Sequence, residues 1–242
     1  PVSAMSPNHC IYRLQPFGCK IILSELQRII KKKSSFCPKG LSMNEITYTE
    51  GDLFAAVDAF AEKSETPGTI VVPHCCNSIG VWGAGFVVPL GRKYKSAELA
   101  YRKWYASDAL PDTVHFPGGN QFGLGRSQIF KVTTVNLTDI AVANMVAQHG
   151  ISRSGRPLRY NALAACMDQV AQVAKTFQGS TIFCPMFGSG LAGGRWDFIE
   201  ELIKDCWLNK GMDVRVFYLK GQTPEGWTPP AIEHGTVSTS MD

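Results

Sequence analysis

From Met43 onward, stretches of strand-forming residues alternate with stretches that have the spacing of amphipathic helices. The clearest strands are residues 69–73, a run rich in β-branched side chains, and residues 181–185. Continuous apolar runs of this kind are typical of strands buried on both faces of a sheet. Further strands are expected at 46–49, 128–135, 139–144 and 213–219, and helices at 53–63, 97–105, 159–177 and 196–208. The alternation predicts a layered α/β domain with a largely parallel central sheet.

The length and composition fit one large domain that carries an appendage. The 242 residues are 45% hydrophobic and 18% charged, as in soluble globular proteins, and no apolar run approaches the roughly 18 residues of a membrane helix. Residues 1–42 lack clear periodicity, so we expect an N-terminal extension that is poorly ordered or outside the natural domain. A basic tail with its own partner is the alternative. The domain is expected at 43–220, followed by a C-terminal tail at 221–242 that frays.

The formal net charge of +4 comes from the N-terminal segment. Seven of the 24 lysine and arginine residues, but only one of the 20 acidic residues, lie within residues 1–42. The remaining 200 residues therefore carry 17 basic and 19 acidic side chains. A nucleic-acid-binding surface needs an excess of positive charge. The domain therefore shows no strong sign of nucleic-acid binding. Because no apolar run is long enough for a membrane helix, we also expect no membrane partner.

The cysteine pattern bears on metal binding and on the cellular compartment. The eight cysteines, at positions 10, 19, 37, 75, 76, 166, 184 and 206, show no Cys-x-x-Cys spacing, so no metal site is expected. Cys75 and Cys76 are adjacent, and in an extended strand adjacent side chains point to opposite faces and do not readily bridge. Packed, reduced thiols are the expectation, which indicates a cytoplasmic, reducing location.

Small and polar residues follow four of the expected strands. They are Gly51 with Asp52, residues 75–78, Asn144, and residues 188–190. Open α/β sheets bind their ligands beyond the carboxyl ends of the strands. The sequence therefore predicts that these four segments surround one crevice.

Two of these segments belong to glycine-rich stretches, residues 77–86 and 187–194, each between a strand and a helix. Glycine lets the backbone approach a ligand closely, and amides at a helix N-terminus suit a phosphate or diphosphate. The first stretch does not have the dinucleotide-binding spacing, and no Lys-Ser/Thr pair follows it as in a P-loop. Taken alone it could be an ordinary glycine-rich turn. Two such loops at one sheet edge predict a ligand with an extended phosphate section.

Four motifs in a fixed order resemble the macrodomain, the ADP-ribose-binding α/β/α module. They are Asp52, residues 73–77 running into 82–85, residues 143–146, and residues 185–191. The resemblance extends from about Ile46 to Leu219 and leaves residues 1–42 outside. It implies a three-layer α/β/α fold with a mixed, largely parallel sheet, ADP-ribose or a derivative of it as the partner, and no cofactor.

The resemblance implies roles for individual residues. Asp52 matches the acid that accepts a hydrogen bond from the adenine amino group, with a backbone contact from Leu53, although an N-cap role would also explain Asp52. Asn77 matches the asparagine that faces the distal ribose, with an ordinary loop asparagine as the alternative. Asn144 is expected to line the crevice, or to serve only buried backbone groups. The two diphosphate loops are expected to consist of Gly83, Ala84, Gly85 and Phe86, and of Gly188, Ser189, Gly190 and Leu191.

The expected activity depends mainly on His74. It matches a histidine of the ADP-ribose 1''-phosphate phosphatase branch that has been assigned a catalytic role, and Trp82 and Trp196 strengthen that match. We place His74 and Asn77 in the catalytic set, because a histidine near neutral pKa can act as a general acid or base. A structural histidine at a strand end is the alternative.

We therefore expect hydrolysis of ADP-ribose 1''-phosphate to ADP-ribose and phosphate. Two alternatives stay open, an ADP-ribosyl hydrolase that acts on a modified macromolecule and a reader that binds ADP-ribose without turnover. In the hydrolase branch with a lysine nucleophile, the lysine falls near Met145 or Val146 and an aspartate near Ala192. Because neither group is present, a lysyl covalent mechanism is disfavoured.

Overall fold

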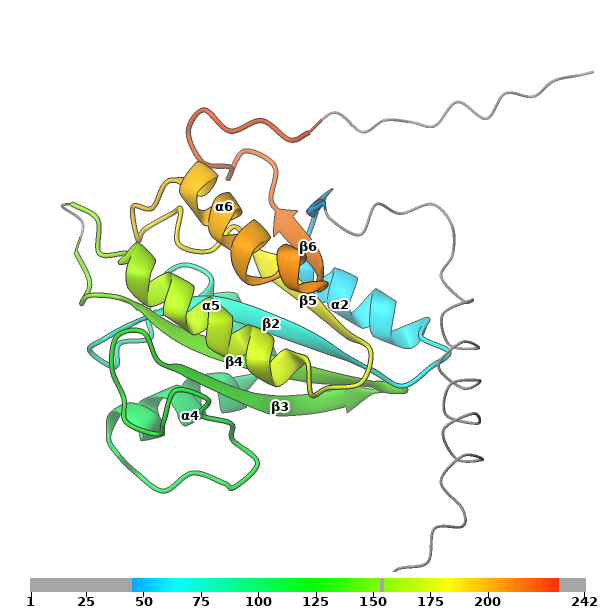
Figure 1. Ribbon diagram of the computed structural model, residues 1–242, viewed down its shortest axis with the longest axis horizontal. Coiled ribbons are helices and arrows are strands. Elements are labelled where there is room, and N and C mark those ends of the chain that lie inside the picture. Colours follow the sequence, from blue (N-terminus) through cyan, green and yellow to red (C-terminus); the bar gives the residue numbers. More distant parts are fainter. Residues whose placement is uncertain (1–44, 153–154, 231–242) are drawn as a thin grey trace, which may run out of the picture. The chain divides into compact units, whose positions relative to one another are not determined.

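The computed structural model describes residues 45–152 and 155–230, which form a mixed sheet with helices on both faces (Figure 1). The strand order is β1-β6-β5-β2-β4-β3. All neighbouring strands are parallel except β3 and β4, which are antiparallel. The strands are β1 (Thr47–Glu50), β2 (Gly68–Asn77), β3 (Ser127–Val135), β4 (Thr138–Gln148), β5 (Ser180–Pro185) and β6 (Asp213–Tyr218). The expected mixed, largely parallel sheet is confirmed.

The helices are divided between the two faces of the sheet. They are α2 (Leu53–Glu62), α3 (Val87–Lys93), α4 (Lys95–Tyr105), α5 (Tyr160–Ala174) and α6 (Trp196–Cys206), with a 3₁₀ turn η1 (Leu208–Lys210). One core cluster joins α5 and α6 to the sheet, and a second joins α2, α3 and α4 to it. In β2, Val71 enters the first cluster while Ile70 and Val72 enter the second, because successive side chains of a strand point to opposite faces. The three-layer α/β/α expectation is confirmed.

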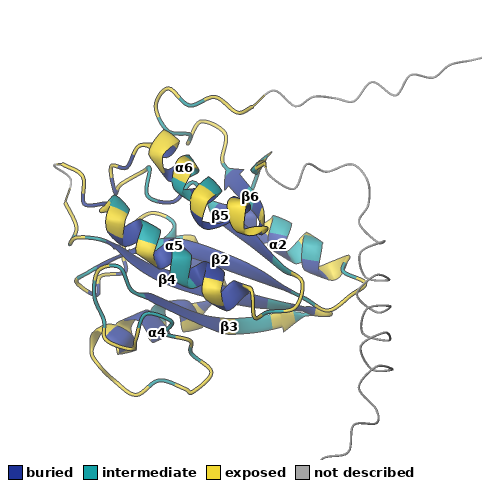
Figure 2. Cartoon of the chain, viewed as in Figure 1, coloured by how far each residue is buried: buried dark blue, intermediate teal, exposed yellow. Residues whose placement is uncertain are grey.

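Burial follows this layering. Figure 2 shows the central strands buried along their length and the helices exposed only on their outer sides. Strand β2 is buried at almost every position from Thr69 to Asn77. Among the described residues, no helix is both long enough and apolar enough to cross a membrane.

Two strands extend further than the sequence predicts, and this changes the place of several polar residues. Strand β2 continues through Asn77 rather than ending at Pro73, and β4 spans Thr138–Gln148 rather than residues 139–144. The extra residues pair in register, with His74 opposite Asn144. The prediction that Asn144 follows a strand is therefore wrong, because it lies within β4. A polar side chain usually indicates that a buried strand has ended. Here His74 and Asn144 stay inside their strands, because each has its polar partner on a neighbouring strand.

Helix α3 was not expected, because Pro89 and Gly91 are poor helix formers. Proline is tolerated in a first helical turn, where its missing N–H has no intrahelical partner. Gly91 is required by a close approach, since an ideal Cβ there would lie 2.8 Å from Nε1 of Trp82. Helix α3 therefore packs directly against the indole of Trp82.

The chain after β6 returns to the edge of the sheet. Trp227 is half-buried and packs against Tyr48 and Tyr218, with ring centroids 5.1 and 5.2 Å apart. The expectation of a fraying tail therefore does not hold as far as Trp227, because an aromatic side chain anchors this segment. The expectations for residues 1–42 and for the end of the tail after Pro230 lie outside the described residues.

Candidate functional site

A crevice of about 1030 Å³ lies at the carboxyl ends of the central strands. Both glycine-rich segments predicted from the sequence line it, together with the end of β2 and the segment after β4. The lining residues are 74–77, 81–87, 148, 151, 152, 155, 157, 185–188 and 190–193. Two segments about a hundred residues apart in sequence thus meet at one site, as parallel strands with short connections require.

Asn77 organises the first loop. Its Oδ1 accepts hydrogen bonds from the backbone amides of Ile79 and Val81, both at 3.1 Å, and its Nδ2 donates to the Val81 carbonyl. Tyr101 of α4 donates its hydroxyl proton to the Asn77 carbonyl at 2.5 Å. The side chain thus closes the turn and still lines the crevice. The loop role of Asn77 is visible in these contacts, and its catalytic and ribose-binding roles stay predictions.

Glycine is needed in this loop for two different reasons. At Gly80 an ideal Cβ would lie 2.3 Å from the ring of Tyr105, and the backbone also has φ +72°, so both space and backbone conformation favour glycine. At Gly85 the reason is the backbone, which has φ +73°. Space is not limiting at Gly85, because the nearest atom to an ideal Cβ is Cδ1 of Leu191 at 3.6 Å. Gly83, Ala84, Gly85 and Phe86 all line the crevice, as the sequence predicts.

The second loop is shaped by contacts within itself. The amide of Gly194 donates to the Gly188 carbonyl at 2.8 Å, and an ideal Cβ at Gly194 would lie 2.6 Å from that same oxygen. The Ser189 hydroxyl donates to the Met186 carbonyl at 2.8 Å. The crevice is lined by Gly188, Gly190 and Leu191. Ser189 does not line it and stabilises the loop through its bond to Met186. Leu191 is 71% exposed at the rim.

Asp52 and Leu53 lie outside the crevice lining. The Asp52 carboxylate accepts the backbone N–H of Ala55 at 2.8 Å, which is the N-cap interaction of α2. Leu53 is buried in the core. Phe54 links this helix end to the site, because its ring stacks on that of Phe86 at 5.5 Å. The capping role of Asp52 is thus visible in the structure, and its adenine contact stays a prediction.

Asn144 does not line the crevice, which corrects the expectation for this residue. It is fully buried, and its Oδ1 lies 2.6 Å from Nε2 of His74. Its Nδ2 donates to Oε1 of Gln128 at 2.8 Å and to the Ala97 carbonyl at 3.3 Å. The sequence analysis missed Gln128, although a polar residue just before the apolar pair Ile129 and Phe130 is a signal that could have indicated a buried partner.

His74 lines the crevice but is only 1% exposed. Burial lowers the pKa of its imidazole from the usual 6.5 to about 4, and interactions with the Asn144 side chain and the Cys75 backbone oppose this shift in part. The ring is packed edge-on against Trp82, with centroids 5.4 Å apart and planes at 83°. His74 is therefore a neutral imidazole at pH 7.

The described part of the crevice wall contains no aspartate, glutamate, lysine or arginine. Burial raises the pKa of the Cys75 and Cys76 thiols, so these residues are poor nucleophiles. Met145, Val146 and Ala192, where a lysine and an aspartate would be needed for a lysyl mechanism, are buried and apolar. No cluster of three potential metal ligands is found among residues 45–152 and 155–230.

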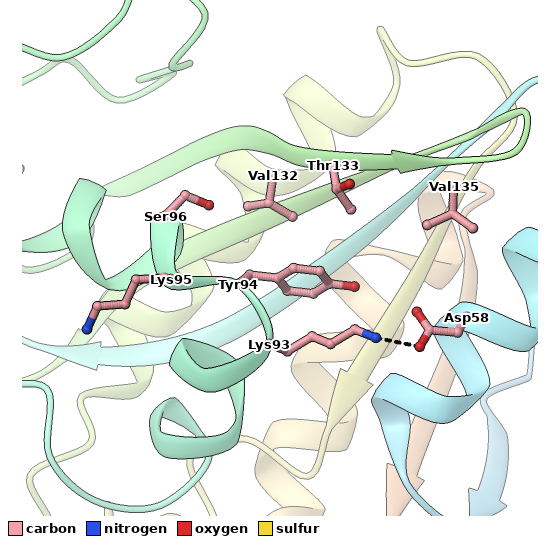
Figure 3. Close-up of a pocket in the computed structure, with 8 residues that line it drawn as sticks. All are labelled: Asp58, Lys93, Tyr94, Lys95, Ser96, Val132, Thr133 and Val135. Carbon is pink, nitrogen blue, oxygen red and sulfur yellow. Dashed lines mark hydrogen bonds and ion pairs between the residues drawn. The ribbon is translucent and has the colours of Figure 1, made fainter.

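Figure 3 shows a second cavity, of about 380 Å³, that shares no lining residue with the crevice. Lys93 reaches Asp58 with a 2.5 Å ion pair across it, and Lys95 pairs with Glu98 at 2.6 Å. The Tyr94 hydroxyl is buried at this cavity and has no hydrogen-bond partner among the described residues. Because both lysines are already paired, the wall presents no uncompensated charge, and the crevice is the better candidate site.

Several solved structures resemble this chain. A protein of unknown function from Bacteroides thetaiotaomicron is 35% identical, and the match covers 72% of this chain and 97% of that one with a TM-score of 0.58. A macrodomain protein from Streptomyces coelicolor is 32% identical, with 72% and 99% covered and a TM-score of 0.54. The DarTG protein of Thermosipho africanus, solved in complex with ADP-ribose, is 14% identical with a TM-score of 0.51, and it shares the fold.

One curated relative carries a functional name. It is the ADP-ribose 1''-phosphate phosphatase of Lodderomyces elongisporus, 34% identical over 59 residues, which are 24% of this chain and 33% of that protein. The match thus spans about a third of the relative's length. No family model matches the chain. Since the Streptomyces coelicolor macrodomain protein is matched over nearly its whole length at 32% identity, this chain belongs to the macrodomain family.

Proposed function

We propose that this chain binds ADP-ribose in the crevice and hydrolyses ADP-ribose 1''-phosphate to ADP-ribose and phosphate. The observation that carries the proposal is the meeting of two glycine-rich loops at one crevice whose wall includes His74. The phosphatase name of the Lodderomyces elongisporus relative supports the reaction, and the ADP-ribose in the Thermosipho africanus structure supports the ligand.

Binding would rely on backbone groups. Because no charged side chain belongs to the described wall, amide N–H groups of the two loops are the donors for the diphosphate. Gly85 has no side chain between its amide and the crevice. The apolar wall around Phe86, Phe187 and Leu191 suits the nucleoside and ribose parts of the ligand. Such a site predicts micromolar binding, roughly −8 kcal/mol.

The hydrolytic step needs one base. A water molecule attacks the 1''-phosphorus and loses a proton to the unprotonated nitrogen of the neutral His74. The bond between phosphorus and the oxygen on C1'' breaks, and that oxygen then takes up the proton from His74, so ADP-ribose and inorganic phosphate leave and the imidazole is regenerated. The low pKa keeps His74 unprotonated at pH 7, as a general base must be.

A non-catalytic reader is the second candidate, and one observation favours it. A pKa of about 4 makes His74 a weak base, and its ring is almost fully covered. The described crevice wall offers no carboxylate that could replace it. The reader and the phosphatase would bind ADP-ribose with the same loops, so only turnover separates them.

We also propose that the protein works in a reducing cytoplasm without nucleic-acid or membrane partners. The five described cysteines are all free, and the N-terminal segment carries the excess positive charge. Recovery of the protein mainly from an oxidising compartment of its source cells, such as the secreted fraction, would contradict the part of this proposal that concerns the compartment.

The test combines binding and turnover in the wild type and in the variant His74→Gln. Calorimetry with ADP-ribose measures binding, and phosphate release from ADP-ribose 1''-phosphate is compared with ADP-ribose release from a modified protein. We expect phosphate release that falls about a hundredfold or more in His74→Gln, while the ADP-ribose affinity stays within about threefold. Binding without any phosphate release would overturn the phosphatase and support the reader. Release of ADP-ribose from the modified protein alone would support the hydrolase.

A further inference from the structure

A chain of buried amide groups connects His74 to helix α4. Gln128 Nε2 donates to the Ala100 carbonyl at 3.1 Å, and Asn144 Nδ2 donates to Gln128 Oε1 at 2.8 Å and to the Ala97 carbonyl at 3.3 Å. The chain ends at His74, whose Nε2 lies 2.6 Å from Asn144 Oδ1. Gln128, Asn144 and His74 come from three neighbouring elements, β3, β4 and β2, and each is 0 or 1% exposed.

The direction of every hydrogen bond in this chain is fixed by its far end. The carbonyls of Ala97 and Ala100 only accept, so the NH₂ groups of Asn144 and Gln128 must face them. Gln128 then presents Oε1 to Asn144, and Asn144 presents Oδ1 to His74. Because Oδ1 is an acceptor, Nε2 of His74 carries a proton. The other close contact of the ring is Cys76 Sγ, 3.8 Å from both nitrogens, and its thiol can donate to an unprotonated Nδ1. Reversing either amide would place its oxygen against a backbone carbonyl that can only accept, in a region without solvent.

We infer that Gln128 and Asn144 are positioning residues that hold His74 in the Nε2–H tautomer and leave Nδ1 as its basic nitrogen. The role of Nδ1 in catalysis rests on the proposed phosphatase function. The tautomer itself does not depend on that function, since it follows from the buried chain.

Helix α4 is the common support of this chain and of the first loop. Ala97 and Ala100 orient the amides, while the neighbouring Tyr101 donates to the Asn77 carbonyl at the end of β2. Helix α4 therefore determines which nitrogen of His74 is protonated, and it also holds the first glycine-rich loop in position. A change at Asn144 or Gln128 should alter the chemistry of His74 without removing a ligand contact, because neither residue lines the crevice.

The direct test is nitrogen-15 NMR of the histidine rings in the full-length wild-type protein at pH 7. The His74 signals are assigned by their loss in His74→Gln, which is needed because the chain has five histidines. We expect Nε2 to give the signal of a protonated nitrogen and Nδ1 that of an unprotonated nitrogen. The Nδ1–H tautomer, an even mixture, or a doubly protonated ring would each overturn the inference, whether or not any variant folds.

Variants then connect the tautomer to turnover. Asn144→Leu removes the acceptor for Nε2–H, and Gln128→Leu removes one acceptor that orients Asn144. We expect kcat for ADP-ribose 1''-phosphate to fall about tenfold or more in Asn144→Leu and less in Gln128→Leu, with KM unchanged and the His74 nitrogen signals shifted. Asn144→Asp keeps an acceptor at the same place, so we expect the Nε2–H signal to return. The added carboxylate should raise the pKa of His74, so the acid limb of the pH profile of kcat should move to higher pH.

Ser127→Ala is the matched control. Ser127 precedes Gln128 in β3, is also fully buried, and donates to the Cys166 carbonyl at 3.2 Å, outside the amide chain. We expect its kcat and His74 signals to match the wild type. Equal losses in Ser127→Ala and Asn144→Leu would overturn the positioning role and indicate general destabilisation. If the wild type released no phosphate while His74 was in the Nε2–H form, the proposed function would fail and the tautomer assignment would stand.

Discussion

Acidification should destabilise this protein through His74 more than through an exposed histidine. The folded-state pKa of about 4 lies below the usual value of 6.5 because the ring is buried. Below pH 6.5 the unfolded chain binds a proton at this residue that the folded chain does not bind. The free energy of unfolding therefore decreases as the pH falls from about 6.5 to about 4 and changes little outside that window on this account. Linkage gives a loss of about 2 kcal/mol at pH 5 and about 3 kcal/mol at pH 4.

Denaturant unfolding at pH 7.5 and pH 5.0, in the wild type and in His74→Gln, measures this loss. Glutamine does not titrate, and its amide N–H can still donate to Asn144, so the buried acceptor stays satisfied. The other histidines are present in both proteins and cancel in the comparison. We expect the wild type to lose about 2 kcal/mol more than the variant between the two pH values. Equal losses would refute the reasoning, because they would mean that the folded state accepts the proton at His74 as readily as the unfolded chain does.

Three further perturbations test the site and the boundaries of the domain. Gly85→Glu places a negative charge beside the expected diphosphate, where repulsion at about 5 Å costs about 3 kcal/mol, so calorimetry should show ADP-ribose affinity falling about a hundredfold. Gly85→Ala is the control, because it meets the same φ of +73° and has room for its Cβ, and it should lose far less ADP-ribose affinity. Equal losses of affinity in the two variants would indicate backbone strain instead of charge repulsion. Trp227→Ala should lower the free energy of unfolding by about 1–2 kcal/mol, because the indole packs on Tyr48 and Tyr218; an unchanged melting temperature would contradict this contribution. A chain that begins at Met43 should keep its melting temperature and ligand affinity, and a fall of ten degrees or more would place the domain boundary earlier.

The layers and the sheet could be predicted because their signals are local. The apolar runs that mark β2 and β5 reflect strands covered on both faces, and that cover is what a three-layer fold supplies. The helical periodicity of α5 and α6 similarly reflects one buried face each. The two glycine-rich loops could be placed at one edge because parallel strands direct their carboxyl ends the same way.

Features that depend on partners distant in sequence were misplaced. Asn144 looked like a residue at a strand end, because nothing near it in the sequence reveals that His74 and Gln128 satisfy its amide. Helix α3 was missed because its glycine, unfavourable by propensity, is required by the indole of Trp82, which is nine residues away. In each case a tertiary contact overrides a local preference.

The described crevice wall has no charged side chain and a single imidazole. In this crevice, binding and catalysis would therefore depend on different groups. Backbone amides of the two loops would hold the diphosphate in a reader and in a phosphatase alike, and they do not depend on His74. Whether the bound ligand is also cleaved then depends on the protonation and the free nitrogen of one buried ring. Asn144 and Gln128, which lie beneath the wall, fix which nitrogen is unprotonated, and burial keeps the ring neutral. A single substitution in the core could therefore convert an enzyme with this crevice into a reader while every group that contacts ADP-ribose stays in place.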